Sequence, residues 1–265
     1  MKINAAGISH TGLIREKNED NLYFFDCFLE EEHEGTESVL EYTGSTGESP
    51  LLFGVFDGMG GYAKGERASF LTARLAGRYA KICQNQPSGT DMEVIGDCLR
   101  DLCYEANRLV CGEMEENREK MGTTASMLCF SGKEAVLCNI GDSPVFLLRE
   151  GVLEEISEEH TQRAMYEKLL GKEHVGNRKF PLTQCIGIPE REMRIRPYVS
   201  IDEVRPGDRF LICSDGLTDM VTSETIRDFL RKDLPRKRLL EEMVEEALDQ
   251  GGRDNITILL IDLFA

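Results

Sequence analysis

The sequence lacks long apolar runs, a basic leader and any excess of positive charge. No stretch approaches the roughly 18 consecutive apolar residues of a membrane span, and no basic region followed by an apolar run opens the chain. We therefore expect no membrane span, no signal peptide and a cytoplasmic location. The net charge of -17 disfavours nucleic acid and anionic membranes as partners, because both repel an acidic surface.

Paired cysteine motifs are also missing. The 9 cysteines form no C-x-x-C pair, and their number is odd. Cys129, Cys138 and Cys213 lie in apolar runs, where cysteine behaves as a small buried hydrophobe. This usage fits a reducing compartment rather than a disulfide framework. Internal repeats and a proline-rich linker are absent too, and the length of 265 residues permits one or two domains.

An apolar run, Leu51–Phe56, ends at Asp57 and is followed by the glycine-rich turn GMGG. The run has the length of a buried strand, and beyond Gly65 the apolar spacing becomes that of a helix. Three interpretations are open: an ordinary Asp-Gly turn, a dinucleotide fingerprint G-x-G-x-x-A at residues 58–63, and a metal carboxylate. The fingerprint is disfavoured because Asp57 would face the pyrophosphate and no acid-ended strand follows about 20 residues later.

Three further aspartates lie at the edges of predicted strands, beside glycine or a tight turn: Asp142, Asp215 and Asp254. Carboxylates gathered at one edge of a sheet repel each other unless cations neutralise them. A set of oxygen ligands without His or Cys favours magnesium or manganese over zinc. The recurrence of acids at strand ends therefore favours the metal interpretation.

The remaining periodicity predicts a mixed α and β chain. Amphipathic spacing predicts helices at 71–82, 91–115 and 239–247, and a short helix that Ser223 could cap. Apolar runs predict strands at 22–28, 145–148, 209–214 and 256–261, and a hairpin at 121–140. Residues 30–50 are expected to form a loop or an exposed hairpin extension, and the irregular segment at about 151–189 a surface flap.

Seven short motifs, taken in order, resemble those of the type-2C metal-dependent serine/threonine protein phosphatases in their compact bacterial form. They are Arg15-x-x-Asn18-Glu19-Asp20, Asp57-Gly58-Met59-Gly60-Gly61, Gly122-Thr123-Thr124, Gly141-Asp142-Ser143, Leu182-Thr183-x-x-Ile186-Gly187, Ser214-Asp215-Gly216-x-x-Asp219 and Gly252-x-Asp254-Asn255. Because the motifs extend over nearly the whole chain, 1–265 is expected to be a single catalytic domain. The resemblance implies an α+β fold, a β-sandwich of two antiparallel sheets flanked by helices on both outer faces.

The resemblance also implies a role for each metal-binding residue. Asp57 would bridge two tightly bound manganese or magnesium ions, and the Gly58 carbonyl would help to hold one of them. Asp215 and Asp254 would hold the first ion, and Glu19 would act on the second, through water. A hydroxide that bridges the two ions would then attack phosphorus in line.

Three more residues complete the implied site. Asp142 and Asp219 match the family's weaker third metal position, although Asp219 could equally cap the helix near Ser223. Arg15 would grip the substrate phosphate, for which its planar guanidinium is well suited. The substrates would be phosphoserine and phosphothreonine in proteins, and an opposing serine/threonine kinase is an expected partner.

The chain departs from the family pattern at three places. Met59 stands where animal members carry a histidine proposed as general acid, so the leaving-group proton must come from another source. Pro144 stands where arginine is usual, which removes a local ion pair. Gln184-Cys185 replaces the usual arginine-alanine pair. These changes affect the support of the site more than its metal ligands.

Two rival functions remain. Cys185 to Arg191 fits the C-x5-R pattern of cysteine phosphatases, but no histidine precedes it, and Pro189 removes one backbone N–H from the phosphate cradle. The other rival is a non-catalytic phosphoprotein-binding relative. The intact acids at 57, 215 and 254 argue against that rival, because a degenerate site loses its ligands first.

Overall fold

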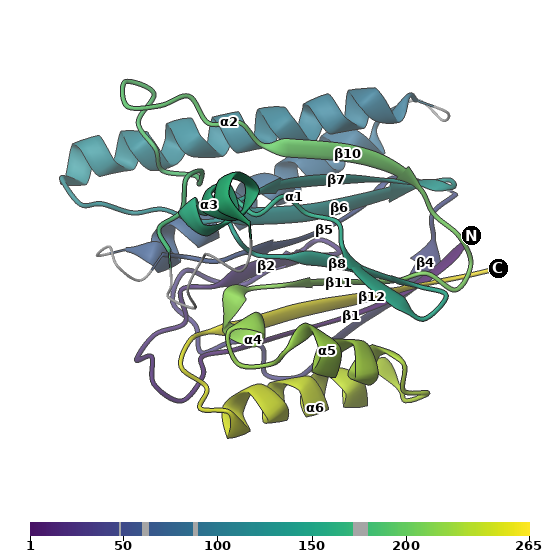
Figure 1. Ribbon diagram of the computed structural model, residues 1–265. Helices are drawn as coiled ribbons and strands as arrows, with labels where there is room; N and C mark the ends of the chain where they lie inside the picture. The colour runs from purple at the N-terminus through teal and green to yellow at the C-terminus, as the bar shows by residue number, and fades with distance from the viewer. Residues whose placement is uncertain (48, 60–63, 87–89, 172–179) are drawn as a thin grey trace.

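The computed structural model describes residues 1–47, 49–59, 64–86, 90–171 and 180–265. Within these residues two six-stranded antiparallel sheets stack as a sandwich (Figure 1). Sheet A has the order β4 (Leu40–Ser45), β1 (Lys2–His10), β12 (Ile256–Phe264), β11 (Arg209–Cys213), β8 (Val145–Arg149) and β9 (Val152–Glu155). Sheet B has the order β10 (Tyr198–Glu203), β7 (Glu134–Ile140), β6 (Ala125–Ser131), β5 (Leu51–Phe56), β2 (Asn21–Phe24) and β3 (Cys27–Phe28).

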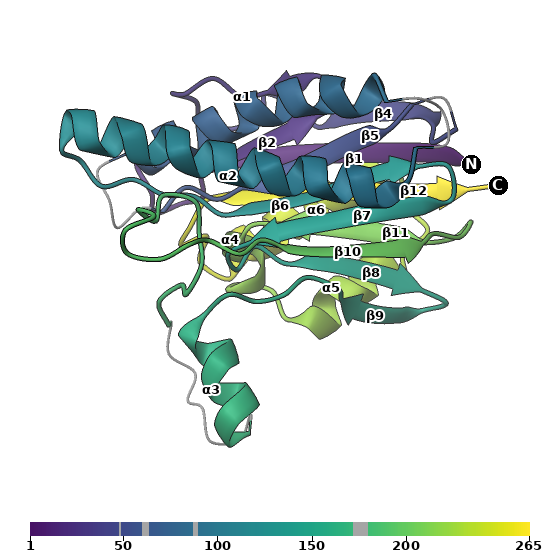
Figure 2. The same ribbon diagram turned by 90° about the horizontal axis from the view of Figure 1, so that it is seen from above.

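Helices cover both outer faces of the sandwich. On sheet B lie α1 (Gly65–Gln84) and α2 (Met92–Asn117), and on sheet A lie α4 (Asp215–Thr218), α5 (Ser223–Leu230) and α6 (Arg236–Asp249). The remaining helix, α3 (Gln162–Leu170), stands away from the two sheets (Figure 2). The predicted sandwich with helices on both outer faces is confirmed. No helix within the described ranges is long and apolar enough to cross a membrane.

The central strands are apolar on both faces because each sheet lies between two packed layers. In β5, Leu51, Phe53 and Val55 pack into the core between the sheets, whereas Leu52 and Phe56 pack against α1 and α2. Successive side chains of a strand point to opposite faces, so a strand buried on both faces appears in the sequence as an unbroken apolar run. The same arrangement holds for β6 and β12.

Several predicted boundaries differ from the structure. Residues 22–28 form two short strands, β2 and β3, because Phe25 and Asp26 adopt left-handed φ angles of 42° and 61° and reverse the chain. The expected loop or hairpin extension at 30–50 contains an edge strand, β4, which pairs with β1. Leu40 and Tyr42 of β4 pack against the core between the sheets, which gives this edge one anchored face.

The segment predicted as a flap contains regular structure. β9 extends sheet A at its edge, and α3 begins after Thr161, whose hydroxyl accepts the backbone N–H of Ala164. Residues 172–179 of this segment lie outside the described residues, as do Gly60 and Gly61 of the glycine-rich motif.

Candidate active site

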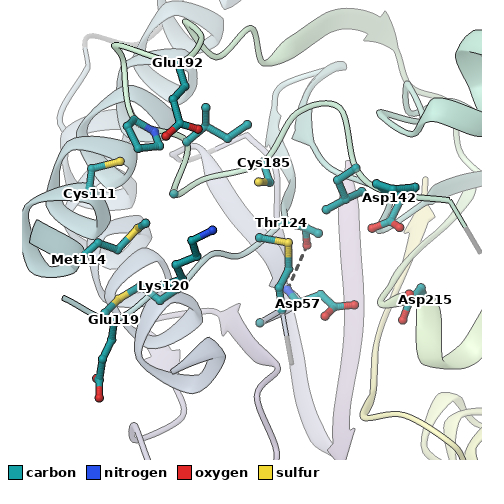
Figure 3. Close-up of a pocket in the computed structure, with 18 of the residues that line it drawn as sticks. Asp57, Cys111, Met114, Glu119, Lys120, Thr124, Asp142, Cys185, Glu192 and Asp215 are labelled. Atoms are coloured by element: carbon teal, nitrogen blue, oxygen red, sulfur yellow. Dashed lines mark hydrogen bonds between the residues drawn. The ribbon is translucent and has the colours of Figure 1, made fainter. Parts of the chain in front are cut away.

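A cavity of about 1370 Å³ lies at one end of the sandwich, where several strands of both sheets end. Predicted site residues from distant parts of the chain line it: Arg15, Asp57, Gly58, Asp142, Asp215 and Asp254. Figure 3 labels Asp57, Asp142 and Asp215 among them. A second cavity of about 570 Å³ shares Asp142, Asp215 and Asp254 and adds Asp219. The structure thus gathers the predicted aspartates around one region.

Asp57 is held by its backbone. Its N–H donates to Thr124 Oγ1 (3.0 Å), and its carbonyl accepts from Thr124 N and Thr123 Oγ1 (both 2.9 Å) (Figure 3). Thr124 Oγ1 lies 2.7 Å from Ser143 Oγ, next to Asp142. The Gly-Thr-Thr motif therefore joins the end of β5 to the turn after β7, which fixes two of the aspartates relative to each other.

Gly58 occupies a position that only glycine fits. A Cβ atom here would clash with the backbone carbonyl oxygens of Glu19 and Gly65. The Gly58 N–H donates to the Glu19 carbonyl (3.1 Å), and the Glu19 carboxylate accepts the backbone N–H of Gly65 at the start of α1. A carboxylate at a helix N-terminus is favoured by the helix dipole. Glu19 is not among the described residues that line either cavity, but its backbone contacts Gly58, which lines the main one.

Asn255 joins the two ends of the chain beside the site. Its side-chain amide donates to the carbonyls of Thr11 and Lys17 (2.8 and 2.9 Å), and Oδ1 accepts the N–H of Glu19 (2.8 Å). The N–H of Asn255 donates to the carboxylate of Asp254 (3.0 Å). This residue therefore sets the loop that carries Arg15 and Glu19 against Asp254.

Asp20 is a buried acid whose role the sequence interpretation missed. Ser214 Oγ donates to Asp20 Oδ2 (2.7 Å), which joins the start of β2 to the residue before Asp215. Burial raises the pKa of Asp20 to about 7, against the lowering effect of its hydroxyl partners. Asp20 belongs to the Arg15-x-x-Asn18-Glu19-Asp20 motif, and this was the one signal in the sequence. The motif alone does not tell whether Asp20 binds a metal ion or supports the residues that do.

His160 is a second supporting residue that sequence reasoning missed. Its ring Nδ1 accepts the N–H of Gly141 (3.2 Å), and the backbone N–H of His160 donates to the Gly141 carbonyl (3.0 Å). Gly141 has a φ of 111°, which a residue with a side chain rarely adopts. His160 therefore supports the turn that presents Asp142. A single histidine within the irregular segment at about 151–189 carried no sequence signal for this contact.

Burial and neighbouring acids raise the pKa values of Asp57 and Glu19. Burial, followed by the charges of Asp20, Asp215 and Asp142, holds the pKa of Asp57 well above its ordinary value. Burial and the charge of Glu66 likewise raise the pKa of Glu19. Like charges held together in this way favour the binding of a cation, which removes the repulsion.

Arg15 makes a contact that the sequence did not predict. Its Nη2 donates to Asp254 Oδ2 at 2.7 Å, and this hydrogen bond raises the pKa of the guanidinium. The residue expected to grip substrate phosphate thus also neutralises one of the expected metal ligands.

The residues present fit a hard divalent cation. The donors around the cavity are carboxylate and carbonyl oxygens, which suit manganese or magnesium. No group of three or more His, Cys, Asp or Glu side chains within the described ranges could hold an ion as it stands.

Two alternatives from the sequence lose their support. Cys185 lies in the cavity wall as a buried thiol, and burial raises its pKa to about 12, which is unsuited to a nucleophile. Thr222, not Ser223 or Asp219, caps α5, because its hydroxyl accepts the N–H of Thr225 (3.2 Å). Asp219 instead follows α4 with an exposed side chain.

The family model for protein phosphatase 2C matches residues 41–254. The chain belongs to the protein phosphatase 2C family. Among its relatives is the serine/threonine protein phosphatase PstP of Mycobacterium tuberculosis, which is 31% identical over an alignment of 268 positions. The alignment covers 99% of this chain but 45% of PstP. The serine/threonine phosphatase stp of Listeria monocytogenes is 28% identical over 259 residues, 95% of this chain and 92% of that protein.

A solved structure with the same fold is the catalytic domain of PstP in complex with two manganese ions. Its TM-score is 0.75 at 28% identity, and the match covers 100% of both chains. This chain thus spans less than half of the full PstP protein. The family and the named relatives support the predicted enzyme class, a metal-dependent serine/threonine protein phosphatase.

Proposed function

We propose that this protein hydrolyses phosphoserine and phosphothreonine in proteins, with two manganese or magnesium ions bound at the end of the sandwich. The observation that carries the proposal is the convergence of Asp57, Asp142, Asp215 and Asp254 with Arg15 on one cavity. Membership of the protein phosphatase 2C family supports it, as do the two manganese ions in the PstP catalytic domain.

The two ions would be held by oxygen atoms from four parts of the chain. Asp57 would bridge them, the Gly58 carbonyl and Glu19 would serve one side, and Asp215 and Asp254 the other. When bound, the ions supply Lewis acidity, which lowers the pKa of water and offsets the charge of the phosphate. Asp142 and Asp219 would form a weaker third position, which the second cavity favours because it brings them beside Asp215.

The chain's own residues bind and orient the phosphate. Arg15 would donate its planar N–H groups to the phosphate oxygens once Asp254 is engaged elsewhere. Asp57 needs no large movement of its backbone, because Thr123 and Thr124 hold it on both sides. Met59 carries no transferable proton, so we assign it a packing role against Gly122.

The proposed cellular setting follows from chemistry. All nine cysteines are free thiols, which fits a reducing compartment such as the cytoplasm. An opposing serine/threonine kinase would supply the phosphorylated substrates, because phosphate monoesters on serine and threonine arise by phosphoryl transfer.

The test is phosphate release from matched phosphoserine, phosphothreonine and phosphotyrosine peptides, titrated with manganese, magnesium and a chelator. We expect metal-dependent release from the first two peptides and none in excess chelator. If phosphopeptides bind but no phosphate is released at any metal concentration, the non-catalytic alternative replaces the proposal. Equal activity with and without chelator would exclude the metal site.

A further inference from the structure

Residues 185–189 form part of the wall of the main cavity, to which Cys185, Gly187, Ile188 and Pro189 contribute (Figure 3 labels Cys185). Apart from one isolated bridge at Ile186, these five residues, all of which the structure describes, belong to no helix or strand. Contacts with other parts of the chain therefore determine where this segment lies.

Asn107 of α2 binds three backbone groups of segment 185–189 with one side chain. Its Oδ1 accepts the N–H of Gly187 (2.8 Å) and the N–H of Ile188 (3.1 Å), and its Nδ2 donates to the Ile188 carbonyl (2.9 Å). Asn107 is 8% exposed, so water could replace few of these contacts. Because a buried polar group without a partner is costly, the amide fixes the segment to α2.

The segment is held on its other side by residues 121–123. Ile186 and Thr123 exchange two backbone hydrogen bonds, of 3.0 and 2.9 Å. Gly187 has a φ of 106°, and a Cβ atom on it would lie 2.5 Å from the Met121 carbonyl oxygen. The backbones are therefore too close for the segment to shift toward Met121 when its contact with α2 is lost.

Thr123 carries the contact on to Asp57. Its hydroxyl donates to the Asp57 carbonyl (2.9 Å), and its backbone bridges Gly58. A continuous series of contacts thus runs from Asn107 through segment 185–189 and Thr123 to Asp57, the residue proposed to bridge the two ions. Groups that orient a metal ligand contribute to metal affinity although they do not touch the ion.

We propose that Asn107 is a positioning residue of the active site, which holds Asp57 in place for metal binding by fixing segment 185–189 to α2. Asn107 is not among the described residues that line the main cavity, so it acts through this segment and not on the substrate. Its loss should therefore affect small and large substrates alike. The effect on turnover rests on the proposed phosphatase function, whereas the effect on metal binding can be measured without turnover.

The first variant is Asn107→Leu, which replaces the amide with an apolar group of similar shape. Loss of a direct partner of a metal ligand typically weakens metal binding by about 10- to 100-fold. Asn107 acts through a segment and Thr123, so we expect the dissociation constant for manganese, from isothermal titration of metal-stripped protein, to rise by about three- to tenfold. Turnover of a phosphothreonine peptide and of a small aryl phosphate should fall by one common factor.

The second variant, Asn107→Asp, tests the same contacts by rescue. A protonated aspartate offers an acceptor for the two N–H groups and a donor for the Ile188 carbonyl, as the amide does, whereas the ionised form has no donor. The neighbouring Cys111 Sγ, 3.9 Å from Asn107 Oδ1, is a thiol whose pKa burial raises, so it stays neutral. Manganese binding by Asn107→Asp, relative to the wild type at the same pH, should therefore recover as pH falls from about 8 to about 6.

Thr46→Val is the matched control for a general loss of stability. The Thr46 hydroxyl is also buried and donates to the Gly132 carbonyl (2.6 Å) in the turn between β6 and β7. That turn lies at the opposite end of β6 from Thr124 and the site. Thermal unfolding in chelator measures the stability of each variant, and Thr46→Val should bind manganese like the wild type even though it is less stable.

The inference is overturned if Asn107→Leu binds manganese like the wild type, or if Thr46→Val weakens binding as much. It is also overturned if Asn107→Asp at the lowest pH still binds as weakly as Asn107→Leu, or if only the phosphopeptide reaction is impaired. If Asn107→Leu does not fold, the recovery of Asn107→Asp decides alone. A wild type that binds manganese but hydrolyses no phosphopeptide refutes the proposed function, and the manganese titrations still decide the role of Asn107.

Discussion

Replacing Arg15 with alanine should tighten metal binding even though it weakens substrate binding. Arg15 Nη2 lies 2.7 Å from Asp254 Oδ2, and Asp254 is one of the proposed metal ligands. An ion and a guanidinium cannot both use the same carboxylate oxygen. In the wild type, metal binding has to break this ion pair, which makes binding less favourable. Arg15→Ala has no such pair, so its metal binding lacks this penalty.

The exposure of the two side chains sets the size of the effect. They are 37% and 23% exposed, so solvent screens the pair. Ion pairs of this kind contribute about 0.2–1 kcal/mol, which corresponds to a change of about 1.4- to 5-fold in a dissociation constant. Loss of a positive charge beside the ions acts in the same direction. We expect the dissociation constant for manganese to fall by about two- to fivefold.

Isothermal titration of metal-stripped protein with manganese, in the absence of phosphate, measures this change. Lys237→Ala is the control, because Lys237 is an exposed cation on α6 that lines neither cavity. The control should bind manganese like the wild type, and only Arg15→Ala should also raise KM for a phosphopeptide. If Arg15→Ala binds manganese as weakly as the wild type or more weakly, the competition for Asp254 does not exist.

Three other changes probe the surroundings of the site. Asp142→Ala should keep two tightly bound ions but raise the manganese concentration needed for turnover, and an unchanged manganese titration would argue against a third position. Cys185→Ser should retain activity, whereas loss of activity in this variant would restore the cysteine mechanism. Iodoacetamide should label Cys185 slowly, because burial raises the pKa of its thiol to about 12. Burial lowers the pKa of His160, so the unfolded state takes up a proton that the folded state resists. The wild type should therefore lose unfolding free energy relative to His160→Asn as pH falls from about 7 to about 5 in chelator, and denaturant unfolding that shows equal losses would contradict this.

The strand-end aspartates could be predicted because local sequence carries their signal. Asp57 ends an apolar run and precedes glycine, and the structure requires glycine at residue 58 because the Glu19 and Gly65 carbonyls leave no room for a Cβ. The long helices were predictable for a similar reason. The apolar stripe of α2, for example, is buried against sheet B from Met92 to Val110.

The missed features depend on contacts between distant residues. β1 contains Ala5, Ala6 and Gly7, which are weak strand formers, and it becomes a strand because β12 and β4 pair with it on both sides. The contact between Arg15 and Asp254 joins residues 239 positions apart. No local pattern encodes such a pair. The sequence therefore predicted a set of candidate metal ligands but not the side chains that contact them.

The central claim is that phosphate release depends on metal held by Asp57. It is tested most directly by phosphate release from one phosphothreonine peptide, measured before chelation, in excess chelator, and after manganese is restored. The account predicts that the wild type loses activity in chelator and regains it with manganese, whereas Asp57→Asn is nearly inactive throughout and binds manganese more weakly. Full wild-type activity in chelator, or unchanged manganese binding by Asp57→Asn, would contradict it.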